Sequence, residues 1–343
     1  MKTKRLGRTG LMVTENSFGA LPIQRLSVSD ASALLRAAYD AGINFFDTAH
    51  GYTDSEEKIG AALSDVRSHI YLATKAPAKT RTGVLEQAAL SLSRMKTDYV
   101  DLLQLHNIGA LPDVNDPESA HYGLLEAREK GMCRFIGITT HRLDVALAAA
   151  KSGLYDTVQF PLSYISADDD LALIDVCAAH DIGLIAMKAL AGGLISSADA
   201  AFAFFADKPA VPIWGMQKQA ELQDFLRCAR DGVTMTPALQ EVMEQDRARL
   251  TGNFCRGCGY CAPCPAGIDI SLAARMTLML NRAPWREFTT PAHREMMARI
   301  DNCIGCGACK SRCPYQLDCP SLLRENYAYF KEFVARKDAE QNA

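Results

Sequence analysis

INFFDTA (43–49) opens a series of short apolar runs, and IYLATK (70–75) and YVDLLQLH (99–106) follow it. Further runs are CRFIGITT (133–140), TVQFPL (157–162), IGLIAMK (182–188) and VPIWG (211–215), with an earlier one around residues 13–20. Apolar strands that alternate with helical segments are typical of a parallel sheet covered by helices. Eight such units in about 230 residues predict an α/β fold, a (β/α)8 TIM barrel.

The segments between these runs have the periodicity of amphipathic helices. They are residues 30–41, 55–64, 83–95, 118–130, 142–151, 168–180 and 219–230. The opening KTKRLGRTGLMV (2–13) predicts a hairpin with a glycine-containing turn. A doubly wound open sheet is the alternative fold, but no G-x-G-x-x-G motif follows an early strand.

The pattern changes after residue 235, where a helical stretch leads into a cysteine-rich region. We expect a barrel domain over 1–235, a connecting helix over 236–253, and a small ferredoxin-like domain over 254–343. Within that last domain, PAHREMMARI (291–300) and residues 321–336 are expected to be helical.

The distribution of the 12 cysteines favours metal over disulfides. Cys133, Cys177 and Cys228 are isolated in apolar stretches and are expected to be small buried hydrophobes. The other nine cysteines lie within residues 255–319.

Two runs, CRGCGYCAPCP and CIGCGACKSRCP, contain eight of these nine cysteines. Three thiolates in each C-x-x-C-x-x-C loop can hold three corners of a [4Fe–4S] cluster, and the Cys-Pro that ends each run supplies the fourth ligand to the other cluster. Zinc is the alternative, but it does not explain two such runs. Cys319 is expected to be a spare thiol. The expected ligands are Cys255, Cys258, Cys261 and Cys313 for cluster one, and Cys303, Cys306, Cys309 and Cys264 for cluster two.

Composition argues against several classes of partner. The formal net charge is −3 and no basic arm is present, so we expect no nucleic acid partner. No apolar stretch reaches about 18 residues, and the N-terminus lacks the apolar core of a signal peptide. We therefore expect no membrane association and a cytoplasmic location.

Polar residues gather where the predicted strands end. Asp47 ends the strand predicted within residues 43–49, and Tyr52 follows in the next loop. Lys75 and His106 end the two runs after it. In a barrel of this kind the chemistry lies at the carboxyl ends of the strands. Each residue alone could be structural, but together they predict a catalytic site on this rim.

These segments resemble the aldo-keto reductase superfamily over about residues 3–230, since NFFDTAHGY (44–52), ATK (73–75) and DLLQLH (101–106) match its motifs in order and spacing. The resemblance implies a catalytic tetrad. Tyr52 would be the general acid, Lys75 would lower the pKa of its phenol, Asp47 would hold Lys75, and His106 would orient a substrate carbonyl.

The resemblance also implies a nicotinamide dinucleotide bound across the rim. Thr139, Thr140 and Gln159 would contact the carboxamide, and Met187 would lie under the nicotinamide. The loop of residues 189–193, with Leu190, Gly192 and Gly193, would take the pyrophosphate. The adenine end would lie beyond Gly215, where Lys218 is the nearby cation for a 2′-phosphate. The choice between NADPH and NADH stays open.

The order of the two domains resembles the ferredoxin-fused branch of bacterial aldo-keto reductases. It implies an oxidoreductase that interconverts a small-molecule carbonyl and alcohol with a nicotinamide cofactor. One alternative is an electron-transfer reductase that exchanges electrons with ferredoxin or another redox protein, with or without a flavin. The other is a non-catalytic binding protein, because barrels of this family also serve as channel auxiliary subunits.

Overall fold

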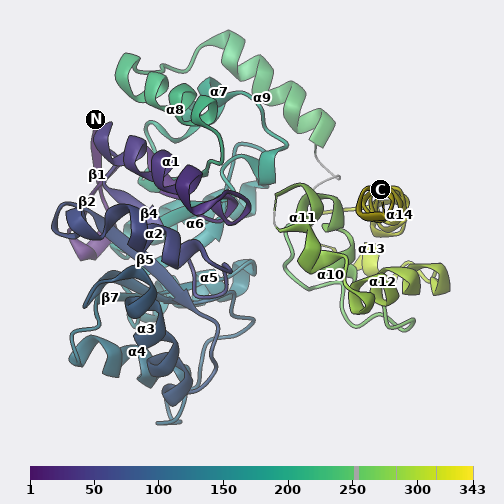
Figure 1. Ribbon diagram of the computed structural model, residues 1–343, viewed down its shortest axis with the longest axis horizontal. Helices are drawn as coiled ribbons and strands as arrows, with labels where there is room; N and C mark the ends of the chain where they lie inside the picture. Colours follow the sequence, from purple (N-terminus) through teal and green to yellow (C-terminus); the bar gives the residue numbers. More distant parts are fainter. Residues whose placement is uncertain (251–254, 283, 314, 343) are drawn as a thin grey trace. The chain divides into compact units, whose positions relative to one another are not determined.

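The computed structural model describes residues 1–250, 255–282, 284–313 and 315–342. The chain divides into two compact units, Met1–Glu244 and Gln245–Ala343 (Figure 1). No helix within the described ranges is both long and apolar enough to cross a membrane.

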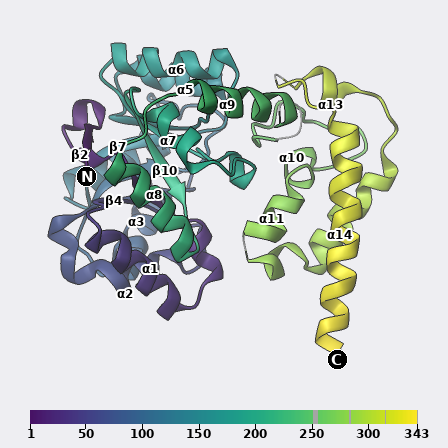
Figure 2. The same cartoon turned by 90° about the horizontal axis from the view of Figure 1, so that it is seen from above.

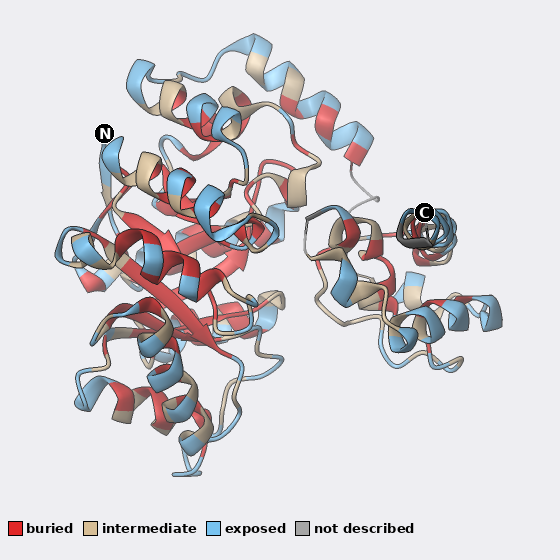
Figure 3. Cartoon of the chain, in the orientation of Figure 1, coloured by how far each residue is buried: buried red, intermediate tan, exposed pale blue. Residues whose placement is uncertain are grey.

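The first unit is a closed barrel of eight parallel strands, which confirms the predicted fold. The barrel closes because β10 pairs with β3 on one side and with β9 on the other. All strands occupy the buried centre of this unit (Figure 3). They are β3 (Ser17–Gly19), β4 (Phe45–Asp47), β5 (Tyr71–Ala76), β6 (Val100–Leu105), β7 (Cys133–Thr139), β8 (Thr157–Pro161), β9 (Gly183–Met187) and β10 (Ala210–Gly215).

Helices surround the barrel, and each predicted helical segment forms one. They are α1 (Val28–Asp40), α2 (Ser55–Leu63), α3 (Arg81–Met95), α4 (Ala120–Glu129), α5 (Leu143–Ser152), α6 (Asp168–Ala179) and α8 (Gln219–Asp231). Helix α7 (Ala198–Phe205) is not among the predicted segments, because its sequence ADAAFAFF is apolar on nearly every side and lacks amphipathic periodicity. The isolated Cys133, Cys177 and Cys228 are buried in β7, α6 and α8, as expected.

The predicted hairpin is present as β1 (Thr3–Arg5) and β2 (Met12–Thr14), which pair antiparallel. Leu6, Leu11 and Val13 from this hairpin pack into the buried cluster at the barrel centre. The turn needs glycine at position 7, because its φ is 50° and a Cβ there would lie 2.1 Å from the Gly183 nitrogen. The hairpin thus fixes one end of the barrel interior.

The second unit is helical and has its own apolar core. The long α14 (Cys319–Asn342) contacts α10 (Ile270–Ala273), α11 (Met276–Arg282), α12 (Pro291–Ala298) and α13 (Ala308–Ser311) (Figure 2). Leu317, Leu323 and Phe330 are among its buried residues. Helix α9 (Pro237–Leu250) spans the division between the two units.

Candidate functional site

The four predicted catalytic residues lie on neighbouring strands and the loop between them. Asp47 is the last residue of β4, Lys75 lies near the end of β5, and His106 directly follows β6. Tyr52 lies in the loop that joins β4 to α2. Because parallel strands end at the same rim, this order places all four side chains at the carboxyl face of the barrel.

Lys75 and Asp47 form an ion pair in the barrel interior. The Lys75 Nζ donates to Asp47 Oδ2 at 2.5 Å and to the Thr48 carbonyl at 2.5 Å. Their side chains are only 1% and 2% exposed. Burial raises the pKa of Asp47, and the ammonium of Lys75 opposes this effect. The pair therefore places a fixed positive charge just beneath the rim.

Tyr52 and His106 face each other above this pair. Their rings make an edge-to-face contact with centroids 5.6 Å apart, and the Lys75 Nζ lies 5.2 Å from the Tyr52 ring centroid. Burial raises the pKa of Tyr52, while the charge and hydrogen bond of Lys75 lower it. Burial and the Lys75 charge lower the pKa of His106 to about 3. At neutral pH the site therefore holds a protonated phenol beside a neutral imidazole.

The side-chain amides of Gln104 and Gln159 are buried and link β6 and β8 to Asp47 at the end of β4. Gln104 was not among the predicted site residues. Gln104 Nε2 donates to Gln159 Oε1 at 2.8 Å, and Gln159 Nε2 lies 3.4 Å from Asp47 Oδ2. Gln104 is fully buried in β6, opposite Lys75 of β5 in the strand register. An amide within the apolar run DLLQLH was the available signal.

The carboxylate of Glu56, which was not among the predicted site residues, supports strand β5. Glu56 is 1% exposed; its Oε1 accepts from the Thr74 hydroxyl at 2.6 Å, and its Oε2 lies 3.3 Å from Arg94. Thr74 immediately precedes Lys75 in β5, so this contact helps to fix the direction in which Lys75 points.

Thr139 and Thr140 are buried at the end of β7, where their hydroxyls bind the loop that follows β6. The Asn107 amide donates to Thr139 Oγ1 at 2.7 Å, and the Thr140 hydroxyl donates to the Ile108 carbonyl at 2.8 Å. These bonds hold the segment that follows His106. Of the three residues predicted to contact a carboxamide, Gln159 is the one whose side chain reaches the tetrad.

The loop after β9 has an unusual backbone. Lys188, Ala191, Gly192 and Gly193 all have positive φ, at 55°, 48°, 69° and 97°. Such conformations cost free energy in residues other than glycine and are concentrated at functional sites. Met187, which ends β9, is half-buried, and Leu190 lies within this loop.

The last predicted cofactor residues lie at the start of α8. Gly215 ends β10, and a Cβ there would lie 3.1 Å from Pro22 of η2 (Pro22–Arg25). The backbone amides of Gln217 and Lys218 donate to Glu221 Oε2 at 2.8 and 3.2 Å. A carboxylate that the sequence analysis missed therefore occupies the N-terminus of α8, beside the predicted cation Lys218.

In the second unit, the first three cysteines of the first run group with the last cysteine of the second run. Cys258 lies close enough to Cys255 and Cys313 for their charges to act on it, although burial is the main cause that raises the pKa of Cys258. Cys261 has the same neighbours, and burial raises its pKa to about 12. A hydrogen bond from Cys319 lowers the pKa of Cys313 to about 6.

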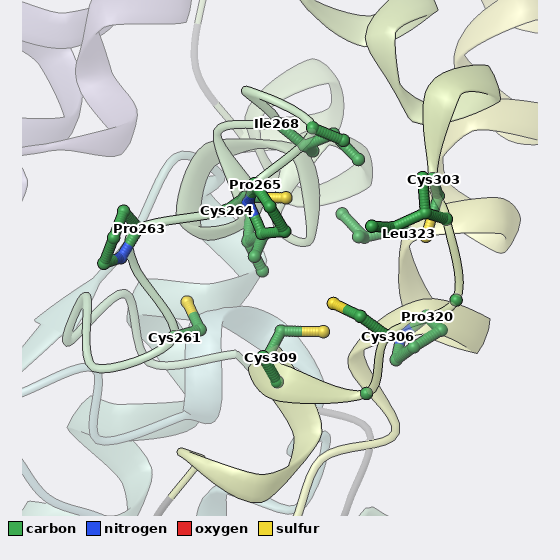
Figure 4. Close-up of a pocket in the computed structure, with 16 residues that line it drawn as sticks. Cys261, Pro263, Cys264, Pro265, Ile268, Cys303, Cys306, Cys309, Pro320 and Leu323 are labelled. Carbon is green, nitrogen blue, oxygen red and sulfur yellow. The ribbon is translucent and has the colours of Figure 1, made fainter.

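A pocket collects the other predicted ligands. Cys264, Cys303, Cys306 and Cys309 line it, together with Cys261 of the first group. Figure 4 shows the side chains of Cys306 and Cys309 pointing toward one another across this pocket.

The loops between the cysteines have the backbone that a cluster requires. Both runs follow the pattern Cys-x-Gly-Cys-Gly-x-Cys, and Gly257, Gly259, Gly305 and Gly307 all have positive φ. No three His, Cys, Asp or Glu side chains among the described residues converge as ligands of one metal ion do. Cysteine thiols that line a pocket fit a cluster of several iron atoms better than they fit a single zinc ion.

Comparisons with known proteins match both parts of the chain. Residues 12–202, more than half of the chain, match the Aldo/keto reductase family, and residues 254–318 match a 4Fe-4S dicluster domain. L-galactose dehydrogenase of Arabidopsis thaliana is 32% identical over 218 residues, covering 57% of this chain and 67% of that protein. A probable voltage-gated potassium channel subunit beta of Oryza sativa is 37% identical over 133 residues, covering 34% and 39%.

Solved structures share the fold. An aldo-keto reductase from Bacillus halodurans, solved in its holo form, superposes with a TM-score of 0.62 at 20% identity. The superposition covers 72% of this chain and 96% of that one.

Proposed function

The chain belongs to the aldo/keto reductase family and carries a 4Fe-4S dicluster domain in its C-terminal region, and we propose that it interconverts a small-molecule carbonyl and its alcohol with a nicotinamide cofactor. The observation that carries this proposal is the buried Lys75–Asp47 ion pair beside Tyr52 and His106. A protein that only binds a partner has no need to bury a charge next to a phenol.

Each of the four residues on the rim has a separate role in the proposed proton transfer to the substrate. The Tyr52 hydroxyl donates its proton to the carbonyl oxygen, and the positive charge of Lys75 stabilises the phenolate that remains. Asp47 holds Lys75 in position through the 2.5 Å contact. His106 stays neutral because its pKa is lowered to about 3, so it orients the carbonyl as a hydrogen-bond donor without competing for the proton. A bound nicotinamide supplies the hydride that this proton transfer accompanies.

Several residues fit a nicotinamide dinucleotide. Gln159 presents its amide within the buried tetrad network. The strained loop of residues 188–193 suits a pyrophosphate, because consecutive amides in such a backbone turn toward one side. At the adenine end, the Glu221 carboxylate already occupies the first amides of α8. This arrangement favours a nucleotide without a 2′-phosphate, which is NADH.

In the C-terminal unit we propose two [4Fe–4S] clusters with exchanged fourth ligands. Cys255, Cys258, Cys261 and Cys313 hold cluster one, and Cys303, Cys306, Cys309 and Cys264 hold cluster two. The neighbours of Cys258 and Cys261 support the first set, and the cysteine-lined pocket supports the second.

One observation favours a second function, in which the clusters receive electrons from ferredoxin or another redox protein. Cys303 and Cys306 are exposed, and Ile304 between them is 70% exposed. An apolar side chain on an exposed ligand loop would let a partner approach cluster two closely. The barrel would then act on its substrate with electrons delivered through the clusters.

The test of the first function is Tyr52→Phe, which removes only the proposed proton donor. We expect turnover of a panel of aldehydes and ketones to fall by about 10²- to 10⁴-fold, as for other general acids, with unchanged cluster spectra. Tyr39→Phe is the matched control, because its hydroxyl lies on α1 near His69. Full activity in the Tyr52 variant would show that the tetrad assignment is wrong.

Anaerobic titration with NADH and then NADPH separates the two functions. We expect neither nucleotide to reduce the clusters while dithionite reduces both, because a hydride moves two electrons together and each cluster accepts one. Cluster reduction by a nucleotide would instead connect the barrel to the clusters and favour the second function.

A further inference from the structure

The ninth cysteine of the C-terminal region lies between the two proposed ligand sets. Cys319 is the first residue of α14 and is only 3% exposed. It belongs to the apolar core with Leu317 and Leu323, and Cys309 and Cys313 pack against that core. A thiol in this position cannot exchange readily with solvent and has fixed neighbours.

Those neighbours are atoms of two proposed ligands. The Cys319 thiol donates a hydrogen bond to the Cys309 carbonyl oxygen, with the sulfur 3.6 Å from that oxygen. Hydrogen bonding from Cys319 is also the main cause that lowers the pKa of Cys313. Cys309 belongs to the set of cluster two and Cys313 to the set of cluster one. A single buried thiol therefore touches both sets.

We propose that the Cys319 thiol donates a hydrogen bond to the sulfur of Cys313 and thereby raises the reduction potential of the cluster that Cys313 holds. The proposal rests on the ligand sets given above. A sulfur bound to iron has lost its proton, so of these two thiols only Cys319 can be the donor.

The choice between its two acceptors follows from charge. Cys319 has one proton, and the ligated sulfur carries negative charge whereas the Cys309 carbonyl is neutral. Hydrogen bonds to charged acceptors are about twice as strong as neutral ones. With the cluster bound, the proton therefore goes to Cys313, at the expense of the hydrogen bond that Cys319 donates to the Cys309 carbonyl.

The effect on the cluster follows from the charge that it gains. One electron added to a [4Fe–4S] cluster increases the negative charge on its sulfurs, and a donor aimed at one of them stabilises the reduced state. The backbone amides of Tyr315 and Leu317 also donate toward Cys313. Substituting the Cys319 side chain leaves these backbone amides in place, so the change in reduction potential measures the contribution of Cys319 alone.

The experiment is a redox titration of anaerobically reconstituted full-length Cys319→Ala, followed by paramagnetic resonance. We expect about eight irons per chain, as in the wild type, and one of the two potentials to become more negative. A tenfold weaker reduction equals about 59 mV for a one-electron couple, and we expect a shift of at least that size. Cys319→Ser keeps a donor and should stay near the wild-type potential. Cys228→Ala, a buried thiol in the barrel unit, is the matched control.

Two outcomes would overturn the proposal. Unchanged potentials in the alanine variant would show that no tuning bond exists, and loss of about four irons would show that Cys319 is itself a ligand. If the alanine variant does not fold, the same titration of Cys319→Val, which fills the space of the thiol without a donor, decides the question, and a potential equal to that of the wild type overturns the proposal. Cys313→Ala tests the ligand set separately, because it should lose the iron of one cluster whatever Cys319 does.

Discussion

Replacing Lys75 with methionine tests the buried ion pair directly. Met matches the length of the lysine stem but leaves the Asp47 carboxylate without its cation. Both side chains are at most 2% exposed, and Asp47 Oδ1 has no hydrogen-bond partner among the described residues. Removing one member of a buried pair costs about 3–5 kcal/mol. We therefore expect Lys75→Met to lower the free energy of unfolding of the barrel by about that amount at pH 7.

The pH dependence of this loss has a definite sign. Burial raises the pKa of Asp47 in the folded protein, and removing Lys75 removes the charge that opposes this. A carboxyl with a raised folded-state pKa destabilises the fold once the pH exceeds its unfolded value, about 3.9. The deficit of Lys75→Met should therefore be greatest at neutral pH and should shrink as the pH falls toward about 4.

Denaturant unfolding with a barrel-specific signal measures this. The chain has two tryptophans, and Trp285→Phe leaves Trp214, which stacks on Phe225 of α8 with ring centroids 4.4 Å apart, as the reporter. Asp47→Asn/Lys75→Met in the same background is the control, because it removes both charges and should recover much of the loss. A single variant that is as stable as the wild type at pH 7, or whose deficit grows in acid, would refute this reasoning.

Two further predictions concern other groups on the rim. His106 should not titrate between pH 5 and 8, because its pKa is lowered to about 3; a chemical-shift titration that uses His106→Gln for assignment would contradict this if the ring protonates near pH 6.5. Glu221→Gln removes a negative charge from the proposed 2′-phosphate position. We expect it to raise the ratio of kcat/KM for NADPH to kcat/KM for NADH by about tenfold. An unchanged ratio would show that the adenine end of the nucleotide binds elsewhere.

The barrel could be predicted because its strands have a local signature. The run 70–75 corresponds to β5 at Tyr71–Ala76, and the run 211–215 to β10 at Ala210–Gly215. Buried parallel strands are nearly all apolar, so the sequence marks them directly. α7 was missed for the opposite reason, since a helix that is apolar all round carries no periodic signal. The predicted helix over 321–336 begins two residues after the observed start of α14, although Pro320 is well suited to a first helical turn.

The site could be predicted only in part. Strand ends identified Asp47, Lys75 and His106, because their position on the rim follows from topology. The contact from Gln104 through Gln159 to Asp47 joins residues 55 and 112 positions apart, and it depends on the register of the strands. The approach of Cys319 to Cys313 depends likewise on how a loop returns to α14. Neither contact has a pattern in the linear sequence.

The proposed asymmetry between the clusters bears on how they could serve a hydride enzyme. Two clusters together hold two electrons, which is the number that one hydride carries, but each accepts only one at a time. If the Cys319 bond leaves cluster one at a higher potential than cluster two, the clusters fill in a fixed order, with cluster one reduced first. The exposed loop around Ile304 belongs to cluster two. In that case an electron that enters there would move downhill to cluster one, whose ligands Cys258 and Cys261 are less exposed than Cys303 and Cys306. Electron flow in this direction leads away from solvent. The electron-transfer function requires such a direction, whereas clusters with a purely structural role require none.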